Sequence, residues 1–342
     1  MNAGSRIVYH APHDIRVEPQ PARPEPGAGE VRVRVEACAI CGTDVKTYRH
    51  GNPRLQPPRT MGHEFCGTID ALGAGVTRYQ PGQRVTMATT MGCGDCFYCR
   101  QRRTNICPHL TAMGFHHDGA MATAVIIPPR GVAQGYLVEV GSLDAELACL
   151  SEPVSCVMNN LSQLPGHGVR TMLIIGLGPL GVLHALAARA RGVEVIVGVV
   201  RNPRPSPFTL TDTVTPDAIP VAIRKWTDGL GFDAVMVTAP DAAMQGAAPA
   251  FARKGGYVSL FASLPVGTEL IQLNSRTVHY GEQTIYGTSD STVAHVEQAV
   301  AFLRANQETV RPIITHRLAL EQFETGIQSI LDRTALKVVL LP

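Results

Sequence analysis

The stretch TMLIIGLGPLGVLHALAARA, residues 171–190, constrains the fold of this 342-residue chain more than any other. An apolar run leads into three glycines spaced as G-x-G-x-x-G, and a helical pattern follows. The first glycine allows a tight turn, the second lets the backbone approach a pyrophosphate, and the third permits close packing of helix on strand. This context predicts dinucleotide binding. The predicted cofactor-binding residues of the turn are Gly176, Gly178, Pro179, Leu180 and Gly181.

Apolar runs and helical patterns alternate from about residue 153 to residue 290, in runs such as VEVIVGVV and FDAVMVTA. This alternation predicts an α/β fold with a doubly wound parallel sheet. We expect one of the intervening helices in DAAMQGAAPAFARKG. Residues 1–150 instead show period-two alternation and frequent turn signals, which predicts all-β structure there. The tail from about 291 mixes helices and strands, ends in the strand ALKVVLL, and is expected to fold back onto the first domain.

The end of the second apolar run bears on cofactor choice. Val199 stands where NAD-binding folds carry an acidic residue, and Arg201 and Arg204 follow. Loss of a carboxylate and gain of arginines suit a 2′-phosphate, so NADP is slightly favoured over NAD. Alternatively, the arginines are solvated loop residues. The Pro-rich segment RPSPFTLTDTVTPDAIP predicts that the next helix is shortened or lost.

A dense cysteine cluster occupies about residues 92–108, with the spacing C-x2-C-x2-C-x7-C. Four thiolates on a short loop form a closed tetrahedral zinc site, which leaves no position open for substrate. The cluster therefore predicts a structural zinc. Its ligands are Cys93, Cys96, Cys99 and Cys107.

A catalytic zinc needs an open position and mixed ligands. Candidates are Cys41 in ICGTD, His63 and Glu64 in GHEF, and Glu152 in LSEPVSC. No periodicity brings these residues together, and each alone is more readily a packed or surface residue than a ligand.

Composition excludes some function classes. The net charge of +2 gives no attraction to nucleic acid or to an acidic membrane surface. The apolar stretch 171–190 is interrupted by glycines, a proline, a histidine and an arginine, which argues against a membrane span. The N-terminal segment has no apolar h-region, so we expect no signal peptide. Nine cysteines, an odd number, then indicate reduced thiols in the cytoplasm.

The order of CGTD, GHE, the cysteine cluster, SEP and GLGPLG resembles the zinc-dependent medium-chain alcohol/polyol dehydrogenase family, in particular its sorbitol and threonine dehydrogenases. The resemblance covers essentially the whole chain. It implies a GroES-like catalytic domain over residues 1–152 and 291–342, and a Rossmann domain over residues 153–290. It also implies one catalytic and one structural zinc per chain.

The resemblance implies roles for the scattered candidates as well. Zinc would polarise the substrate oxygen, Thr43 would take the alcohol proton, and hydride would move to or from the nicotinamide. His50 or His116 would extend the proton relay, or each would be a solvated or structural histidine. The implied catalytic zinc ligands are Cys41, His63, Glu64 and Glu152.

The segment GTSDSTVAH departs from the polyol branch, which can place an arginine there. Ser289 and Asp290 stand in this segment instead, and a carboxylate would suit an amino group on the substrate. The expected substrate is thus a secondary alcohol: a polyol, a cyclitol or an amino-polyol. Alternatively, Asp290 caps the helix that starts near Thr292.

Two other functions stay open. One is an NADPH-dependent carbonyl reductase of a biosynthetic pathway, and the other is a non-catalytic, zinc-stabilised descendant with impaired cofactor binding. The resemblance also implies a homodimer or homotetramer built by edge pairing of Rossmann sheets, for which GGYVSLFASLPVGTELIQL is the candidate segment. The expected partner is a small alcohol or ketone.

Overall fold

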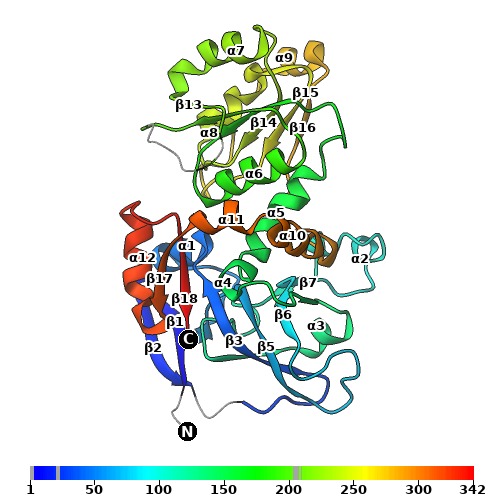
Figure 1. The fold of residues 1–342 in the computed structure, drawn as a ribbon, viewed down its shortest axis with the longest axis vertical. Coiled ribbons are helices and arrows are strands. Elements are labelled where there is room, and N and C mark those ends of the chain that lie inside the picture. The colour runs from blue at the N-terminus through cyan, green and yellow to red at the C-terminus, as the bar shows by residue number, and fades with distance from the viewer. Residues whose placement is uncertain (1–3, 21–23, 203–207, 209) are drawn as a thin grey trace. The chain divides into compact units, whose positions relative to one another are not determined.

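The computed structural model describes residues 4–20, 24–202, 208 and 210–342 (Figure 1). The chain divides into two compact units. Unit 1 contains Met1–Ser155 and Asp290–Pro342, and unit 2 contains Cys156–Ser289. The chain thus leaves unit 1, builds unit 2 and returns.

The largest sheet of unit 1 combines strands from both of its segments. Its order is β10-β6-β5-β3-β18-β17, and β9 also pairs with β3. Because the last strand lies antiparallel beside β3, the C-terminal segment completes a sheet that the N-terminal segment begins. The strands are β3 (Val31–Ala39), β5 (Glu64–Leu72), β6 (Arg84–Met87), β9 (Ala124–Ile127), β10 (Leu137–Glu139), β17 (Ile314–Ala319) and β18 (Lys337–Leu341).

Two smaller sheets complete the strands of unit 1. One has the order β2-β1-β4 and the other pairs β7 with β8. Their strands are β1 (Gly4–Ala11), β2 (Asp14–Gln20), β4 (Arg59–Thr60), β7 (Thr90–Met91) and β8 (Thr111–Ala112).

Unit 1 also contains helices, so the prediction of all-β structure for residues 1–150 is wrong. The clearest exception is α1 (Gly42–His50). Cys41 caps it, since its sulfur accepts the Thr43 N–H at 3.4 Å while the Asp44 carboxylate accepts the Cys41 N–H at 2.8 Å. This reciprocal pair satisfies backbone donors at the helix start. The other helices are α2 (Phe97–Arg100), α3 (Pro129–Ala133), α4 (Ala145–Ala148), α10 (Val293–Ala305), α11 (Gln307–Val310) and α12 (Phe323–Leu331), with 3-10 turns at Thr104–Ile106, Arg311–Ile313 and Leu320–Gln322. Helix α5 (Ser151–Leu161) connects unit 1 to unit 2.

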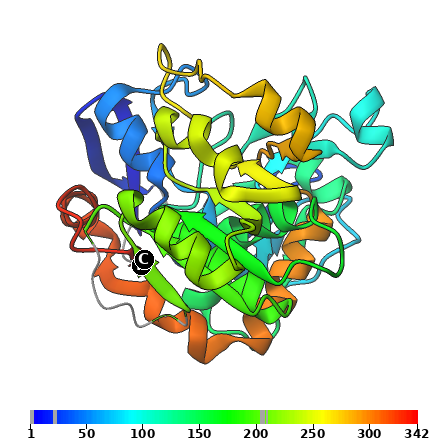
Figure 2. The ribbon, with the colours of Figure 1, turned by 90° about the horizontal axis from the view of Figure 1, so that it is seen from above.

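Unit 2 is built on a six-stranded sheet of order β13-β12-β11-β14-β15-β16. Every neighbouring pair is parallel, which confirms the predicted doubly wound sheet. In the view from above the strands fan out relative to one another (Figure 2), as the twist of such a sheet requires. The strands are β11 (Thr171–Ile175), β12 (Val195–Val199), β13 (Asp212–Val214), β14 (Phe232–Val237), β15 (Ala252–Leu260) and β16 (Thr284–Tyr286).

Helices cover both faces of this sheet. Figure 1 shows α6 (Pro179–Ala190) and α7 (Ile219–Thr227) on opposite sides of the strands. Ile219 and Ala222 of α7 pack with alternate residues of the central strands, among them Leu173 and Val235. The remaining helices are α8 (Ala242–Ala247) and α9 (Ser275–Gly281), with 3-10 turns at Pro216–Ala218 and Ala248–Phe251.

Unit 2 differs from a regular alternation of strands and helices at α8 and in the connection from β12 to β13. The helix expected in DAAMQGAAPAFARKG ends early, because Pro249 cannot continue the hydrogen-bond ladder and β15 begins at Ala252. Between β12 and β13 the described residues contain no helix. Strand β15, in the segment expected to form an edge, lies inside the described sheet, because β16 covers it.

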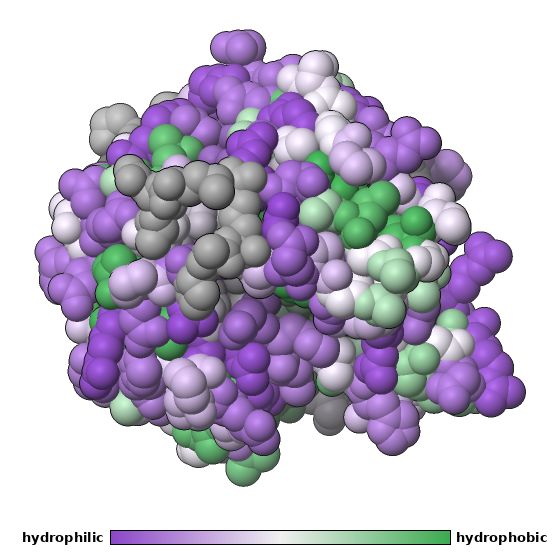
Figure 3. Space-filling model, turned by 90° about the horizontal axis from the view of Figure 1, so that it is seen from below, coloured by the Kyte–Doolittle hydropathy of each residue, from purple (hydrophilic) through white to green (hydrophobic). Residues whose placement is uncertain are grey.

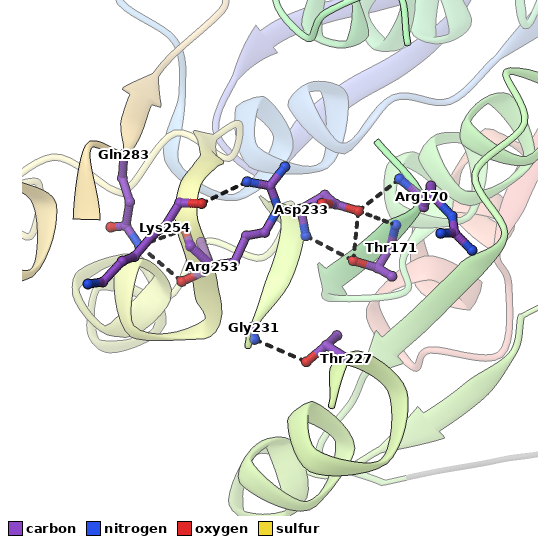
Figure 4. A network of polar contacts seen from close by, with 9 residues as sticks. Arg170, Thr171, Thr227, Gly231, Asp233, Arg253, Lys254 and Gln283 are labelled. Atoms are coloured by element: carbon purple, nitrogen blue, oxygen red, sulfur yellow. Dashed lines mark hydrogen bonds and ion pairs between the residues drawn. The ribbon is translucent and has the colours of Figure 1, made fainter. Parts of the chain in front are cut away.

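Asp233 in β14 ties three strands together at the end of the sheet opposite the Gly-rich turn (Figure 4). Its Oδ2 accepts the backbone N–H groups of Arg170 and Thr171, both at 2.8 Å, at the start of β11. Its Oδ1 accepts the Arg253 Nε–H of β15 at 2.5 Å. Charge-assisted bonds of this kind are the stronger hydrogen bonds in proteins, so Asp233 fixes β11, β14 and β15 relative to one another.

Hydrophobic residues on the face seen from below gather in small groups between hydrophilic ones (Figure 3). None of the helices formed by the described residues combines the length and the apolar character that crossing a bilayer requires.

Candidate functional site

Two neighbouring strands of unit 1 bring three of the dispersed ligand candidates together. Cys41 follows the end of β3, and His63 and Glu64 stand at the start of β5. Ala39 of β3 pairs with Glu64 on one side and with Val339 of β18 on the other. The register of the sheet, not sequence spacing, therefore creates the site.

The geometry of this group fits a zinc ion. One ligand atom each from Cys41, His63 and Glu64 lies within 4.8 Å of the others. A tetrahedral zinc with bonds of about 2.0–2.3 Å separates its ligand atoms by about 3.3–3.8 Å, which small side-chain adjustments reach. Buried Glu64 Oε1 has no hydrogen-bond partner among the described residues. A buried carboxylate oxygen without a partner is costly, and a cation beside it removes that cost.

Glu152, which the family resemblance implies as a further ligand, is not in this group of three. It lies in the first turn of α5 and is partly buried. The pKa of Glu152 is raised to about 7, chiefly by burial; His63 opposes this shift, and the charges of Glu64 and Asp290 contribute to it. Its carboxylate is thus electrostatically coupled to the group.

Sequence reasoning missed two charged neighbours of the ligands. Asp44 Oδ1 lies 3.7 Å from His63 Nδ1, and its charge, with that of Cys41, raises the pKa of His63 against the effect of burial. Lys337 of β18 pairs with the Glu64 carboxylate and donates to the Ile40 carbonyl at 3.0 Å. The sequence held a signal for each. Asp44 belongs to the motif CGTD, and Lys337 is a charged residue directly before the apolar run VVLL.

Phe115 is a third missed neighbour, and no spacing signalled it. Its ring centroid lies 5.4 Å from that of His63. His116, a candidate for the relay, follows it and is exposed. Thr43 is partly buried beside Cys41, whereas His50 is exposed in the last turn of α1.

The four cysteines of the predicted structural site converge. One sulfur from each lies within 4.8 Å of the others. The sulfurs of Cys93 and Cys99 are 3.9 Å apart and those of Cys96 and Cys107 are 3.7 Å apart. A tetrahedral zinc with four Zn–S bonds of about 2.3 Å needs separations of about 3.8 Å, so the group fits zinc closely. The pKa of Cys96 is lowered to about 7, chiefly by a hydrogen bond between its sulfur and the backbone of Cys99. The lower pKa favours the thiolate form, which binds metal.

The Gly-rich turn of unit 2 connects β11 to α6. Gly176 has φ +100°, and a Cβ on Gly181 would lie 1.9 Å from the Gly176 carbonyl oxygen, so both positions require glycine. Gly178 is the N-cap residue of α6 and Pro179 is its first residue. A Cβ on Gly178 would meet nothing within 4 Å. This open helix start fits a pyrophosphate.

The end of β12 lies beside this turn, since the Val199 carbonyl accepts the Gly176 N–H at 2.9 Å. Val199 is buried and apolar. The Arg201 side chain is 77% exposed and pairs with Asp241 at 3.1 Å. Arg204 lies outside the described residues.

Ser289 and Asp290 fall on either side of the division between the units. The Ser289 carbonyl accepts from Asn159 Nδ2 at 3.3 Å within unit 2. Asp290 has φ +51°, and Thr292, not Asp290, caps α10. The alternative reading of Asp290 as the helix cap is therefore wrong.

Comparison with known proteins agrees with this geometry. Residues 27–136 match the family model of the alcohol dehydrogenase GroES-like domain. The chain is 29% identical to a sorbitol dehydrogenase of Halalkalibacterium halodurans, over 98% of each chain. It is 30% identical to an L-threonine 3-dehydrogenase of Pyrococcus horikoshii, over 86% of this chain and 85% of the relative. A crystal structure from Sinorhizobium meliloti, described as a zinc-binding dehydrogenase bound to NADP, superposes with a TM-score of 0.90 over all of both chains at 27% identity.

Proposed function

The chain belongs to the zinc-dependent medium-chain alcohol and polyol dehydrogenase family, and from this premise we propose which of its residues carry the chemistry. The protein is a zinc-dependent oxidoreductase that transfers hydride between an alcohol and a nicotinamide cofactor. The observation that carries our assignment of the site is the convergence of Cys41, His63 and Glu64 in unit 1.

Cys41 and His63 hold the catalytic zinc in this proposal, and the carboxylates of Glu64 and Glu152 complete its surroundings. When bound, zinc supplies a Lewis acid for the substrate oxygen, and the nicotinamide accepts or returns the hydride. Asp44 orients the His63 ring, as carboxylates behind ligating histidines do. The Thr43 hydroxyl, two residues from Cys41, takes the alcohol proton and passes it toward solvent.

The four-cysteine group binds a second, structural zinc. Its closed set of sulfurs supports this role, because no ligand position remains for substrate. The two units have separate roles in this proposal. Unit 1 carries both metals, and unit 2 binds the dinucleotide at the Gly176–Gly181 turn.

NADP is the proposed cofactor. Buried Val199 offers no carboxylate to the adenosine ribose, and the exposed guanidinium of Arg201 can bind a 2′-phosphate. The NADP bound to the Sinorhizobium relative supports the same choice.

The proposed substrate is a secondary alcohol such as a polyol or cyclitol. Asp290 contributes to the raised pKa of Glu152, and its carboxylate would suit the amino group of an amino-polyol. This favours amino alcohols as the second candidate substrate class.

We also propose a cytoplasmic homodimer or homotetramer. Val266 and Leu270 of unit 2 are 97% and 93% exposed, although both are large and apolar. Contact with another subunit would remove this surface from water.

The test combines metal analysis with a screen of secondary alcohols against NAD and NADP. We expect two zinc ions per chain, turnover with NADP, and loss of turnover in Cys41→Ser with one zinc retained. A zinc-loaded protein that binds neither nucleotide would instead be the non-catalytic scaffold. Turnover of neutral polyols but of no amino alcohol would rule out the second substrate class.

A further inference from the structure

Exposed Arg54 lies beside the proposed catalytic group in unit 1, together with Phe115 and His116. The guanidinium carbon of Arg54 lies over the Phe115 ring, 5.5 Å from its centroid. The same ring contacts the His63 imidazole. Phe115 is buried, so it holds Arg54 one aromatic ring away from a metal ligand.

Arg54 is available to a ligand. It is exposed, and no carboxylate in the described part of the chain forms an ion pair with its guanidinium. Stacking on an aromatic face restricts the guanidinium but leaves its N–H edge open. That edge matches the two oxygens of a carboxylate or phosphate.

His116 adds a donor beside Arg54. Its Nδ1 accepts the Ala112 N–H at 3.1 Å, so the proton of the neutral ring sits on Nε2. Burial lowers the pKa of His116, and the charges of Arg54 and Arg59 lower it further. The nearby carboxylate of Asp118 is occupied by Arg59, at 3.3 Å.

We infer that the alcohol substrate carries an oxyanion group, a carboxylate or a phosphate, which Arg54 binds with the help of His116 while the hydroxyl group lies at the Cys41–His63 group. The inference rests on the proposed function, because it defines the substrate of that site. Since Phe115 touches both His63 and Arg54, a short carbon chain separates the hydroxyl from the anion. The neutral polyols expected from the family resemblance would leave Arg54 without a partner.

Matched pairs of secondary alcohols test this inference on the zinc-loaded full chain. 3-Hydroxybutyrate is compared with 2-butanol for the carboxylate, and glycerol 3-phosphate with glycerol for the phosphate. Calorimetric affinity and kcat/KM are both measured for the parent protein, Arg54→Gln and Arg49→Gln. Arg49 is an exposed arginine of α1, so its variant controls for the loss of one positive charge.

We expect one anionic compound to bind at least about tenfold more tightly than its neutral counterpart, because hydrogen bonds to charged groups contribute on this scale. Arg54→Gln should abolish that preference, whereas Arg49→Gln should keep both the preference and the turnover of the neutral alcohols. The pair that shows the preference identifies carboxylate or phosphate as the group.

Equal affinity for charged and neutral members in the parent protein would overturn the inference, as would a preference that survives Arg54→Gln. Arg54→Lys keeps the positive charge but loses the paired N–H donors of the guanidinium. It should give an intermediate preference for the anionic compound. Failure of the proposed function looks different: no alcohol is then turned over with either cofactor, whatever the anion affinity.

Discussion

The ammonium group of Lys337 pairs with the carboxylate of Glu64 inside unit 1, where the two side chains are only 5% and 1% exposed. Glu64 begins β5 and Lys337 begins β18, the strands on the two sides of β3, although 272 residues lie between them in the sequence. The ammonium group also donates to the Ile40 carbonyl, next to Cys41. Lys337 therefore neutralises one carboxylate of the proposed metal site and fixes its position.

Replacing Lys337 by Met should be strongly destabilising. The change leaves the Glu64 carboxylate buried beside an apolar side chain, and such broken pairs cost about 3–5 kcal/mol. Denaturant unfolding of the zinc-loaded protein measures the loss. The double variant Lys337→Met with Glu64→Gln should recover part of it, because no charge is then left unpaired. A single variant as stable as the parent would contradict the pairing.

The structural cysteines should behave differently from Cys41. Cys99→Ser is expected to remove about one zinc equivalent, because a closed thiolate site needs all four ligands. It should also lower the thermal midpoint, since metal binding contributes to the folding of such loops. Metal analysis and thermal unfolding check both. A chain in which Cys99→Ser retained both zinc ions would contradict the assignment of the four-cysteine group.

The cysteine cluster and the Gly-rich turn could be predicted because each is local. Cys93 and Cys107 lie within one short loop, and Gly176 and Gly181 lie within one turn, so spacing alone carries the geometry. The catalytic group is not local. Cys41 and His63 meet through the pairing of β3 with β5, and no periodicity in the sequence gives that register.

The C-terminal strand shows the same limit more sharply. The apolar pattern of β18 predicts a strand, but its neighbour is β3, from the other end of the chain. The partnership of Lys337 with Glu64 follows only from this pairing. Phe115 was unpredictable for a related reason, because it reaches His63 from a segment without regular secondary structure.

Arg201→Gln should weaken NADP use selectively. A guanidinium on the 2′-phosphate contributes a charge-assisted hydrogen bond, and at an exposed site we expect its loss to raise the KM for NADP about tenfold. The KM for NAD should stay unchanged, because NAD lacks that phosphate. Arg224→Gln, at an exposed arginine of α7, is the matched control. A parallel change for both cofactors would contradict the role of Arg201.

His184 should make the stability of unit 2 fall in acid. Its Nδ1 donates to the Leu180 carbonyl at 2.7 Å, its Nε2 accepts from Asn160 Nδ2 at 2.9 Å, and the residue is fully buried. This arrangement needs the neutral ring, and burial lowers the pKa of His184 from 6.5 to about 4. The unfolded chain therefore binds more protons than the folded chain between those values, so the contribution is complete above pH 6.5 and is lost as the pH falls toward 4.

The expected loss from His184 is about 2 kcal/mol between pH 7 and pH 5, because one pKa unit corresponds to about 1.4 kcal/mol. Denaturant unfolding of the parent protein and of His184→Gln at both pH values isolates the contribution of His184. The two proteins share every zinc ligand, so any effect of pH on metal binding is the same in both. The variant should be less stable at pH 7, and the difference should shrink at pH 5. Parallel pH dependences in the two proteins would show that His184 does not stay neutral in the fold.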